Sequence, residues 1–419
     1  MNQVPNAGLK TPLQKEDWYI KRFKYLFKKL NRPVRDDDGI VTAFRDGLVT
    51  LRSNRRKDGF TFADKEIGYQ GVEPNDLVIH AMDGFAGAIG VSDSRGKCSP
   101  VYSIAIPITP DATYPRFWGY YLRNLAISGF IESLAKGIRE RSTDFRWKDV
   151  SNLLVNFPNY EIQKGIADFL DRETDLINQL IEKKEIFLLK ASKRIESLVD
   201  KAISCPRVSR IRFENVTQRM QRTVNLAEYD ELIRLGLYNR GRGIFKKPAA
   251  DEEGMGDSRF FFVEPGDLIL SGQFSWEGAV ALATSKEDGC VVSHRYPIYR
   301  GKGSVNTAYL FGLLRSNFGD FILNEASRGS AGRNRPLNTW RLGKEKIPVP
   351  DISLQKEIEQ AVIFERRLRE KTQRSINILE EFRTSLITEA ITGQLDIELW
   401  KKRCGTNVCL DNIEEKMRA

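Results

Sequence analysis

The sequence predicts an α+β fold in which a globular block followed by a long helix occurs twice along the chain. Three observations predict it. The length of 419 residues suits two or three domains, and short runs of sequence recur at a shift near 192 residues. Two stretches, 161–205 and 351–398, have the apolar spacing of helices and almost no helix-breaking residues. Internal similarity at a long and nearly constant shift indicates a duplicated structural unit.

Several short matches carry the repeat, and they keep the same order in both copies. Val-Glu-Pro-Asn-Asp-Leu-Val at 72–78 returns as Val-Glu-Pro-Gly-Asp-Leu-Ile at 263–269, and Gln-Lys-Xaa-Ile at 163–166 returns at 355–358. Smaller matches pair Gly47-Leu48 with Gly236-Leu237, Leu122-Arg123 with Leu314-Arg315, Arg141 with Arg333, Pro158 with Pro350, and Ser197-Leu198 with Ser385-Leu386. The last pair has a shift of 188, as if one helical turn were missing from the second copy.

Each globular block, at 1–160 and 206–350, mixes strands and helices. The Glu-Pro-Xaa-Asp sequences have residues typical of turns. An apolar run follows each of them, and a Gly-rich loop follows each run. Strands are predicted at 77–79, 101–108, 268–270 and 291–299, and helical spacing is found at 117–134 and 307–323. We therefore expect each block to be α+β.

The long helices at 161–205 and 351–398 are followed by a tail at 399–419. Their apolar residues recur at steps of three, four and seven, which places them on one helix face. The positions expected to pack are Ile177, Ile181, Leu188, Ile195 and Leu198 in the first helix, and Ile376, Leu379 and Leu386 in the second. The other helix is the nearest partner for such a stripe; the alternative is that each helix packs only on its own globular block.

The composition is that of an ordinary globular protein, with 41% hydrophobic and 29% charged residues. No apolar run approaches the ~20 residues of a membrane span, and we find no signal segment, so we expect a cytoplasmic protein. The five cysteines are scattered, which indicates reduced thiols. His80 and His294 are too few for a His-rich metal site or a Ser/His/Asp triad, so no metal site is predicted.

The net charge of +10 is confined to the two globular blocks. Residues 1–160 hold 24 basic and 18 acidic residues, and 206–350 hold 22 and 16, whereas both helical segments are close to neutral. In the second block 16 of the 22 cations are Arg, whose planar fork of donors suits phosphate and the guanine edge. This distribution favours a polyanion that is met twice along the chain, although Arg-rich surfaces also occur without one.

Motifs of nucleic-acid enzymes are missing from the sequence. Gly96-Lys97-Cys98 and Gly301-Lys302-Gly303 lack the spacing and the hydroxyl of a phosphate-binding loop. The segment 156–160, Asn-Phe-Pro-Asn-Tyr, is weakly similar to the Asn-Pro-Pro-Tyr loop of amino-methyltransferases. We interpret it instead as the end of a strand that precedes the helix. No catalytic residue is predicted.

Basic and amide side chains in loops are the candidate contacts to DNA. Arg-rich stretches at 137–142 and 329–335 lie between a helix and a strand, where a loop could reach a groove. The candidate DNA-binding residues are Arg52, Arg55, Arg56, Lys57, Arg139, Arg141, Arg240, Arg242, Lys246, Lys247, Gln273, Trp276, Arg333 and Arg335. The alternatives are solvated surface charges and, for Gln273 and Trp276, a structural turn with a buried Trp.

Several segments taken together resemble the specificity subunits of type I restriction-modification systems. They are the motifs at 72–78 and 263–269, the run Ile-Pro-Val-Pro at 347–350 with the Leu-Gln-Lys-Glu-Ile that follows at 354–358, and the segments 166–174 and 389–396. The resemblance runs from about residue 20 to 398 in two copies, with Asn75 where Gly is usual. It implies two target recognition domains, each reading one half of a split asymmetric DNA sequence. It also implies that the long helices form an antiparallel coiled-coil spacer between them.

The resemblance further implies a non-catalytic chain that binds double-stranded DNA and two methyltransferase subunits, with two restriction subunits in systems that also cut DNA. S-adenosylmethionine, ATP and magnesium would then be bound by the partner subunits, and no cofactor by this chain. The main alternative is a stand-alone DNA endonuclease or methyltransferase whose site is not recognisable in sequence. A third is an interaction scaffold or RNA-binding protein that dimerises through its helices.

Overall fold

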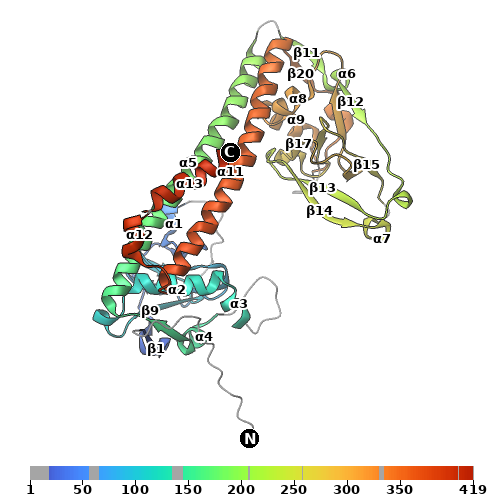
Figure 1. Ribbon diagram of the computed structural model, residues 1–419. Coiled ribbons are helices and arrows are strands. Elements are labelled where there is room, and N and C mark those ends of the chain that lie inside the picture. The colour runs from blue at the N-terminus through green and yellow to red at the C-terminus, as the bar shows by residue number, and fades with distance from the viewer. Residues whose placement is uncertain are drawn as a thin grey trace. The chain divides into compact units, whose positions relative to one another are not determined.

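A computed structural model describes residues 18–55, 66–134, 145–205, 208–256, 258–329, 335–403 and 405–418 (Figure 1). The chain divides into two compact units. Unit 1 consists of Met1–Glu182 and Ser375–Ala419, and unit 2 of Lys183–Arg374. The long helices α5 (Tyr160–Ser204) and α11 (Ile352–Ile391) each contribute one half to each unit. The domain boundaries predicted above separate blocks from helices, and apart from the end of the distal helix they stay a prediction.

Unit 1 contains one four-stranded antiparallel sheet and three pairs of strands. The sheet has the order β2-β9-β6-β7, formed by Phe27–Leu30, Tyr102–Pro107, Leu77–His80 and Ile89–Val91. The pairs are β1-β10 (Tyr19–Arg22 and Leu154–Phe157), β3-β4 (Val41–Ala43 and Val49–Leu51) and β5-β8 (Gln70–Val72 and Gly96–Cys98). The short helices are α1 (Arg52–Arg55), α2 (Pro115–Ile127), α3 (Phe130–Leu134) and α4 (Trp147–Asn152).

The core of unit 1 is aromatic and continues into the long helices. Trp118 on α2 is fully buried, with its ring centre 5.6 Å from that of Phe23 and 5.4 Å from that of Phe157. The same core cluster includes Ile177 of α5 and Leu379 of α11. Burial of these large side chains is the main stabilising contribution, and it ties the sheet, α2 and the helix pair together.

Unit 2 has two four-stranded sheets. The first, β12-β19-β16-β17, is formed by Thr217–Met220, Ile298–Gly301, Leu268–Leu270 and Val280–Leu282. The second, β14-β13-β18-β15, is formed by Ile244–Ala250, Leu232–Leu237, Val291–Ser293 and Phe260–Phe262. A further pair is β11-β20 (Ser209–Arg212 and Lys346–Val349), and the short helices are α6 (Phe213–Val216), α7 (Glu252–Met255), α8 (Thr307–Leu314), α9 (Asn317–Ala326) and α10 (Thr339–Lys344).

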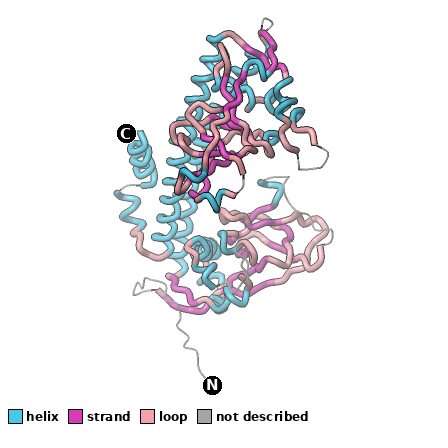
Figure 2. The backbone as a smooth tube through the Cα atoms, turned by 90° about the vertical axis from the view of Figure 1, so that its right-hand side faces the viewer, coloured by secondary structure: helices cyan, strands magenta, loops and turns pink. Residues whose placement is uncertain are grey.

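Corresponding elements have the same connections in the two units. The order β2-β9-β6-β7 is matched by β12-β19-β16-β17, and all neighbours in both sheets are antiparallel. In each of the antiparallel pairs β1-β10 and β11-β20, the second strand is followed directly by a long helix, α5 after β10 and α11 after β20. Figure 2 shows the strands of both units in magenta and the helices in cyan.

The repeated Val-Glu-Pro-Xaa-Asp motif builds the same buried turn in both units. The Asp76 carboxylate accepts a 2.8 Å hydrogen bond from the Glu73 amide, and that of Asp267 accepts 2.9 Å from Glu264. Asp76 pairs with Arg32, and Asp267 with Arg222 and Arg300. The residue before each Asp has a positive φ, 70° at Asn75 and 86° at Gly266. Asn tolerates this left-handed region better than other non-glycine residues, so its replacement of Gly leaves the turn intact.

The repeated glutamines fasten each long helix to its unit. Gln163 is fully buried, accepts hydrogen bonds from the Tyr114 amide and the Trp118 indole, and donates to the carbonyls of Ala112 and Pro158. Gln355 accepts 2.9 Å from the Asn306 amide and donates 2.9 Å to the Pro350 carbonyl. Both side chains therefore satisfy backbone groups at the point where a strand ends and a helix begins.

Three expectations from sequence need correction. Gly47 lies in a hairpin turn with φ 90°, whereas Gly236 lies inside β13, so this match does not join equivalent positions. The structural counterpart of Gly47 is Gly241. Each glycine lies against the matched arginine of its own unit, because an added Cβ would contact Arg123 at Gly47 and Arg315 at Gly241. The stretches 117–134 and 307–323, expected to be helical, each contain two helices. The first is interrupted at Gly129, which has φ 80°, and the second at Ser316, which caps α9.

The third correction concerns the end of the chain. The distal helix ends at Ile391 rather than at 398, where Gly393 has φ 72° and lies against Trp18. The helices α12 (Ile397–Arg403) and α13 (Gly405–Arg418) occupy the expected tail. Trp400 of α12 packs between Phe169 of α5 and Phe382 of α11, with ring centres 6.4 and 6.2 Å away.

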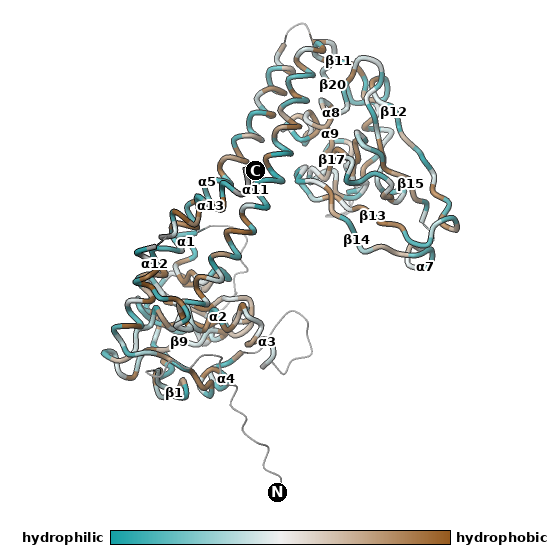
Figure 3. The backbone as a smooth tube through the Cα atoms, viewed as in Figure 1, coloured by the Kyte–Doolittle hydropathy of each residue, from teal (hydrophilic) through white to brown (hydrophobic). Residues whose placement is uncertain are grey.

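The long helices pack together in both units, with apolar and polar residues alternating along them (Figure 3). Unit 1 joins Ile177 of α5 to Leu379 and Leu386 of α11, and unit 2 joins Ile195 of α5 to Ile358 of α11. Of the positions expected to pack, Ile177, Ile195, Ile376, Leu379 and Leu386 are buried, while Ile181, Leu188 and Leu198 are half-buried. Within the described ranges, every helix is too short or too polar to cross a membrane.

Candidate nucleic-acid interface

In unit 2 a hairpin tip and a loop are joined through their backbones. The second hairpin tip (residues 238–243) connects β13 and β14, and the second loop (residues 271–279) follows β16. The Arg240 amide donates to the Glu277 carbonyl at 3.0 Å, and the Gly241 amide donates to the Gly278 carbonyl at 2.8 Å. Residues 30 or more positions apart in sequence are thereby held on one exposed surface.

Three of the candidate DNA-binding residues meet at the second loop. The Arg335 guanidinium lies over the Trp276 ring, 5.4 Å from its centre, and the Trp276 indole donates to the Gln273 carbonyl at 3.1 Å. Asn324 of α9 donates to the Trp276 carbonyl at 3.2 Å and accepts from Arg335 at 3.5 Å. Trp276 is half-buried and the Gln273 side chain is exposed. An arginine stacked in this way is partly immobilised before any ligand binds, which lowers the entropy lost on binding.

The hairpin tip adds two more arginines beside this loop. Arg240 is exposed and has a φ of 58°, a conformation that costs a non-glycine residue about 1 kcal/mol or more. Its backbone bond to Glu277 holds that conformation. Arg242 lies over the Tyr238 ring at 5.6 Å, and Tyr238 and Phe274 are each 46% exposed. Basic groups interleaved with exposed aromatic rings suit a nucleic acid, because they match phosphates and bases together.

Lys246 and Lys247 are exposed on β14, which is an edge strand of its sheet. They are followed by Pro248 on the same strand. Lysine and proline on an edge strand also prevent pairing with another chain, so this position suits two roles. Their strand continues directly from the hairpin tip, so both lysines lie next to the arginines of the tip in sequence.

Unit 1 has the corresponding hairpin and loop, but different side chains. The first hairpin tip (residues 44–48) connects β3 and β4 and lies against the first loop (residues 81–88), where a Cβ on Gly87 would meet the Arg45 carbonyl at 2.8 Å. Arg52 donates to the Thr42 hydroxyl at 2.9 Å, and Arg55 pairs with Asp46 at 2.6 Å and lies over the Phe44 ring. These two arginines therefore help to hold the hairpin together.

Arg45 is a surface residue that sequence reasoning missed. Its side chain is 68% exposed and pairs with Asp83 of the first loop at 2.9 Å. Arg45 in the first hairpin tip corresponds to Arg240 in the second hairpin tip. It lies close to Gly47, the glycine that faces Arg123. The signal available in the sequence was an arginine directly before an Asp-Gly turn.

His80, at the start of the first loop, is an organising group. Its Nδ1 accepts a 2.8 Å hydrogen bond from the Asp83 amide, and burial lowers the pKa of the imidazole although Asp83 opposes this. Because the folded pKa lies below the ordinary value of about 6.5, the ring is neutral at pH 7. His80 thus shapes the loop and adds no positive charge to the surface.

Five of the candidate residues lie outside the described residues: Arg56, Lys57, Arg139, Arg141 and Arg333. The residues that follow two of these stretches are described. The Phe145 amide donates to the Ala81 carbonyl at 3.0 Å, and the Leu337 amide donates to the Gly272 carbonyl at 2.8 Å. The chain therefore resumes beside the first loop in unit 1 and beside the second loop in unit 2. Among the described residues, no group of three or more His, Cys, Asp or Glu could hold a metal ion.

Comparison with known proteins shows a likeness of fold. No protein-family model matches the sequence, and no curated protein matches it. The chain superposes on the S subunit of a type I restriction-modification system from M. genitalium with a TM-score of 0.50 and 14% identity, over 93% of this chain and 99% of that one. It superposes equally, at 0.51 and 14% identity over 92% and 100%, on a chain from a study of complex assembly and conformational transition in the type I R-M system.

These two likenesses define the class of fold. The chain has the mixed α and β fold of a type I restriction-modification S subunit over nearly its whole length. This agrees with the resemblance found in the motifs at 72–78, 263–269 and 354–358.

Proposed function

We propose that this chain is the DNA-recognition subunit of a type I restriction-modification complex. The observation that carries the proposal is the fold shared with an S subunit over almost the whole of both chains. The two basic blocks and their exposed hairpin tips support it, because a DNA-reading chain needs cationic surfaces with base-reading side chains. In this role the chain confers sequence specificity and performs no catalysis.

Each unit would read one half of a bipartite, asymmetric target. Unit 2 presents Gln273, Trp276 and Arg335 with two hairpin arginines, whereas unit 1 presents Arg45 in a pair with Asp83. Amide and guanidinium groups recognise adenine and guanine edges, respectively, in the major groove. Because the side chains differ between the two surfaces, the two half-sites should have different sequences.

The long helices would act as an antiparallel coiled-coil spacer that sets the distance between half-sites and docks methyltransferase subunits. The N-terminal half of α5 packs with the C-terminal half of α11 in unit 1, and the reverse halves pack in unit 2. This pairing is the one that two antiparallel helices make. Two methyltransferase subunits, and two restriction subunits in a cleaving system, complete the complex, and S-adenosylmethionine, ATP and magnesium belong to those partners.

The test is to co-express the chain with a methyltransferase subunit encoded beside it, determine the mass of the complex and map methylated adenines across the genome. We expect two methyltransferase subunits per chain and methylation at one split motif. The alternative, a stand-alone endonuclease or methyltransferase, predicts that the chain cuts or methylates DNA without a partner. Activity of the isolated chain would therefore reject the proposal.

Substitution of Arg335 by Ala should weaken binding of the mapped target by about 1–3 kcal/mol, because a base-reading arginine is lost. The loss should appear on the target and on DNA altered in the unaffected half-site, but not on random DNA. Fluorescence anisotropy at fixed salt measures all three. Arg367→Ala, on the exposed face of α11, is the matched control and should bind as the unmodified chain does. An equal loss on random DNA would make Arg335 a phosphate contact instead.

A further inference from the structure

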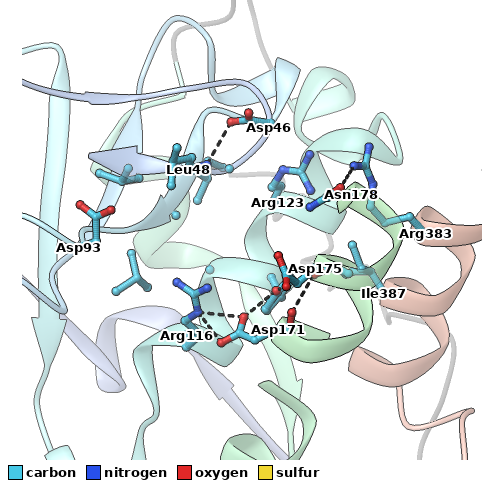
Figure 4. A pocket seen from close by; sticks show the side chains of 18 residues that line it. Asp46, Leu48, Asp93, Arg116, Arg123, Asp171, Asp175, Asn178, Arg383 and Ile387 are labelled. Carbon is cyan, nitrogen blue, oxygen red and sulfur yellow. Dashed lines mark hydrogen bonds and ion pairs between the residues drawn. The ribbon is translucent and has the colours of Figure 1, made fainter. Parts of the chain in front are cut away.

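Unit 1 contains a cavity of about 570 Å³ between the hairpin tip, α2 and the two long helices (Figure 4). Its lining includes Arg123 of α2, Asn178 of α5 and Arg383 of α11. Figure 4 shows Asn178 between the two arginines, with a hydrogen bond from Arg383. All three side chains come from unit 1, so one compact unit builds the whole cavity.

The two arginines carry like charges, and the carboxylates that act on them are Glu380, 3.9 Å from Arg383, and Asp46. Burial and then the positive charge of Arg383 lower the pKa of Arg123, and the charge of Asp46 raises it by less than Arg383 lowers it. The Nε atom of Arg123 is buried and has no hydrogen-bond partner among the described residues, and its Nη2 donates to the Arg45 carbonyl at a long 3.5 Å. Arg383 donates to the Asn178 carbonyl oxygen at 2.5 Å and lies 3.9 Å from Glu380. A buried donor without an acceptor is costly, which indicates a ligand that supplies one.

The aspartates of the cavity wall are Asp46, Asp93, Asp171 and Asp175, and each is bonded to another group, Asp93 to the Ser94 hydroxyl. Asp171 accepts hydrogen bonds from Arg116 at 2.8 Å and from Tyr120 at 2.7 Å. Asp46 pairs with Arg55 at 2.6 Å, and Asp175 accepts 2.7 Å from Gln179. None of these oxygens is paired with Arg123 or Arg383 within the described part of the chain. Apart from the 3.9 Å contact of Arg383 with Glu380 and the charge of Asp46, the described residues give the pair no carboxylate, which leaves donors for an additional anion.

Unit 2 shows which group satisfies the equivalent arginine. Arg315, 192 residues after Arg123, pairs with the buried Glu365 at 3.2 Å. Burial raises the pKa of Glu365, but Arg315 and Arg369 outweigh it and hold that pKa below its usual range. Glu173, 192 residues before Glu365, pairs instead with Arg172. Unit 1 thus keeps the arginine and lacks its internal carboxylate.

We infer that Arg123, Asn178 and Arg383 form an anion site that takes a carboxylate. The guanidinium groups of two helices would hold the two oxygens, and the ligand would take the place that Glu365 fills in unit 2. Planar carboxylates fit the parallel donors of a guanidinium group, and such charge-assisted bonds are among the stronger ones in proteins. The site lies at the contact between α2 and the two long helices of unit 1, so occupancy should stabilise that contact.

The test titrates sodium acetate into the full-length chain by calorimetry, with sodium chloride at matched ionic strength as the reference. We expect saturable acetate binding that chloride does not reproduce. Arg383→Gln should weaken it at least about tenfold, because one charged fork is lost. Arg367→Gln, an exposed arginine on the same helix, should leave it unchanged.

A second variant keeps the inference testable if Arg383→Gln fails to fold. Asn178→Asp places a carboxylate beside Arg383 and so supplies an internal acceptor of the kind that Glu365 provides for Arg315. It should raise the thermal midpoint and abolish acetate binding together. Acetate binding that is equal in the unmodified chain, Asn178→Asp and Arg383→Gln, or that chloride matches, would overturn the inference.

The same titration identifies the source of the carboxylate. If the proposed function holds and a methyltransferase subunit supplies an acidic side chain, acetate binding should disappear in the purified complex. If a free small carboxylate is the ligand, the complex should bind acetate as the free chain does. Absence of binding in the free chain rejects the site alone, because the methylation map tests the proposed function independently.

Discussion

Replacing Asp267 by Ala should lower the stability of unit 2 by about 3–5 kcal/mol. Its carboxylate is fully buried and accepts hydrogen bonds from Arg222 at 2.8 Å, from Arg300 at 2.7 Å and from the Glu264 amide at 2.9 Å. Removing it leaves two guanidinium groups short of an acceptor and releases the turn that enters β16. The expected result is an earlier unfolding transition of unit 2, which hydrogen exchange at the amides of β16 measures directly.

Asp230→Ala is the matched control for this prediction. Asp230 is exposed in the loop before β13, so its loss should change stability by no more than about 0.5 kcal/mol. Equal protection of the β16 amides in Asp267→Ala and Asp230→Ala would show that the buried ion cluster is dispensable. Because the chain has two units, local exchange is a better measure than one global midpoint.

Replacing Gln163 by Leu should destabilise unit 1 by at least about 3 kcal/mol. Leucine has a similar volume, but it leaves the Tyr114 amide, the Trp118 indole and the carbonyls of Ala112 and Pro158 without their partner. The bonds of Gln163 to the Trp118 indole and the Pro158 carbonyl are buried, so solvent cannot replace them, whereas the bonds to the Tyr114 amide and the Ala112 carbonyl are only partly buried. Urea unfolding followed by tryptophan fluorescence, together with hydrogen exchange at the start of α5, measures the loss.

Gln179→Leu, on the same helix, makes the same chemical change at an exposed position. Its amide bonds only Asp175 among the described residues, so we expect a change within about 0.5 kcal/mol. A Gln163→Leu chain that unfolds at the same urea concentration as Gln179→Leu would contradict the assigned role of Gln163 in fastening α5 to unit 1.

The residues that reveal the repeat are scaffold residues. Asp76 and Asp267 hold buried turns, and Gln163 and Gln355 hold helix starts. Each holds a turn or helix start through backbone groups and also bonds a side chain or backbone group 33 or more residues away, and because these bonds recur in both units, both copies need the same residue types. This is why the order of strands and long helices was predictable, and why Gly47 was matched with the wrong glycine, in a region where the hairpins differ in length.

The candidate interface was predictable in composition but only partly in position. Sequence reasoning selected Gln273, Trp276 and Arg335, and the structure brings these three together. It also selected Arg52 and Arg55, which are engaged inside their hairpin, and it missed Arg45. Charge and residue type do not show whether an arginine meets an internal acceptor, because that depends on residues distant in sequence.

The sequence by itself determined the mixed α and β class of fold, the approximate positions of the long helices and the confinement of positive charge to the globular blocks. These features follow from local periodicity, from recurring short motifs and from residue composition. Only the tertiary structure decided which arginines are exposed, which loop meets which hairpin, and that Arg123 lacks the carboxylate that Arg315 finds in Glu365. Such pairings join α2 or α8 to a distant helix, and burial there depends on packing that no local pattern records.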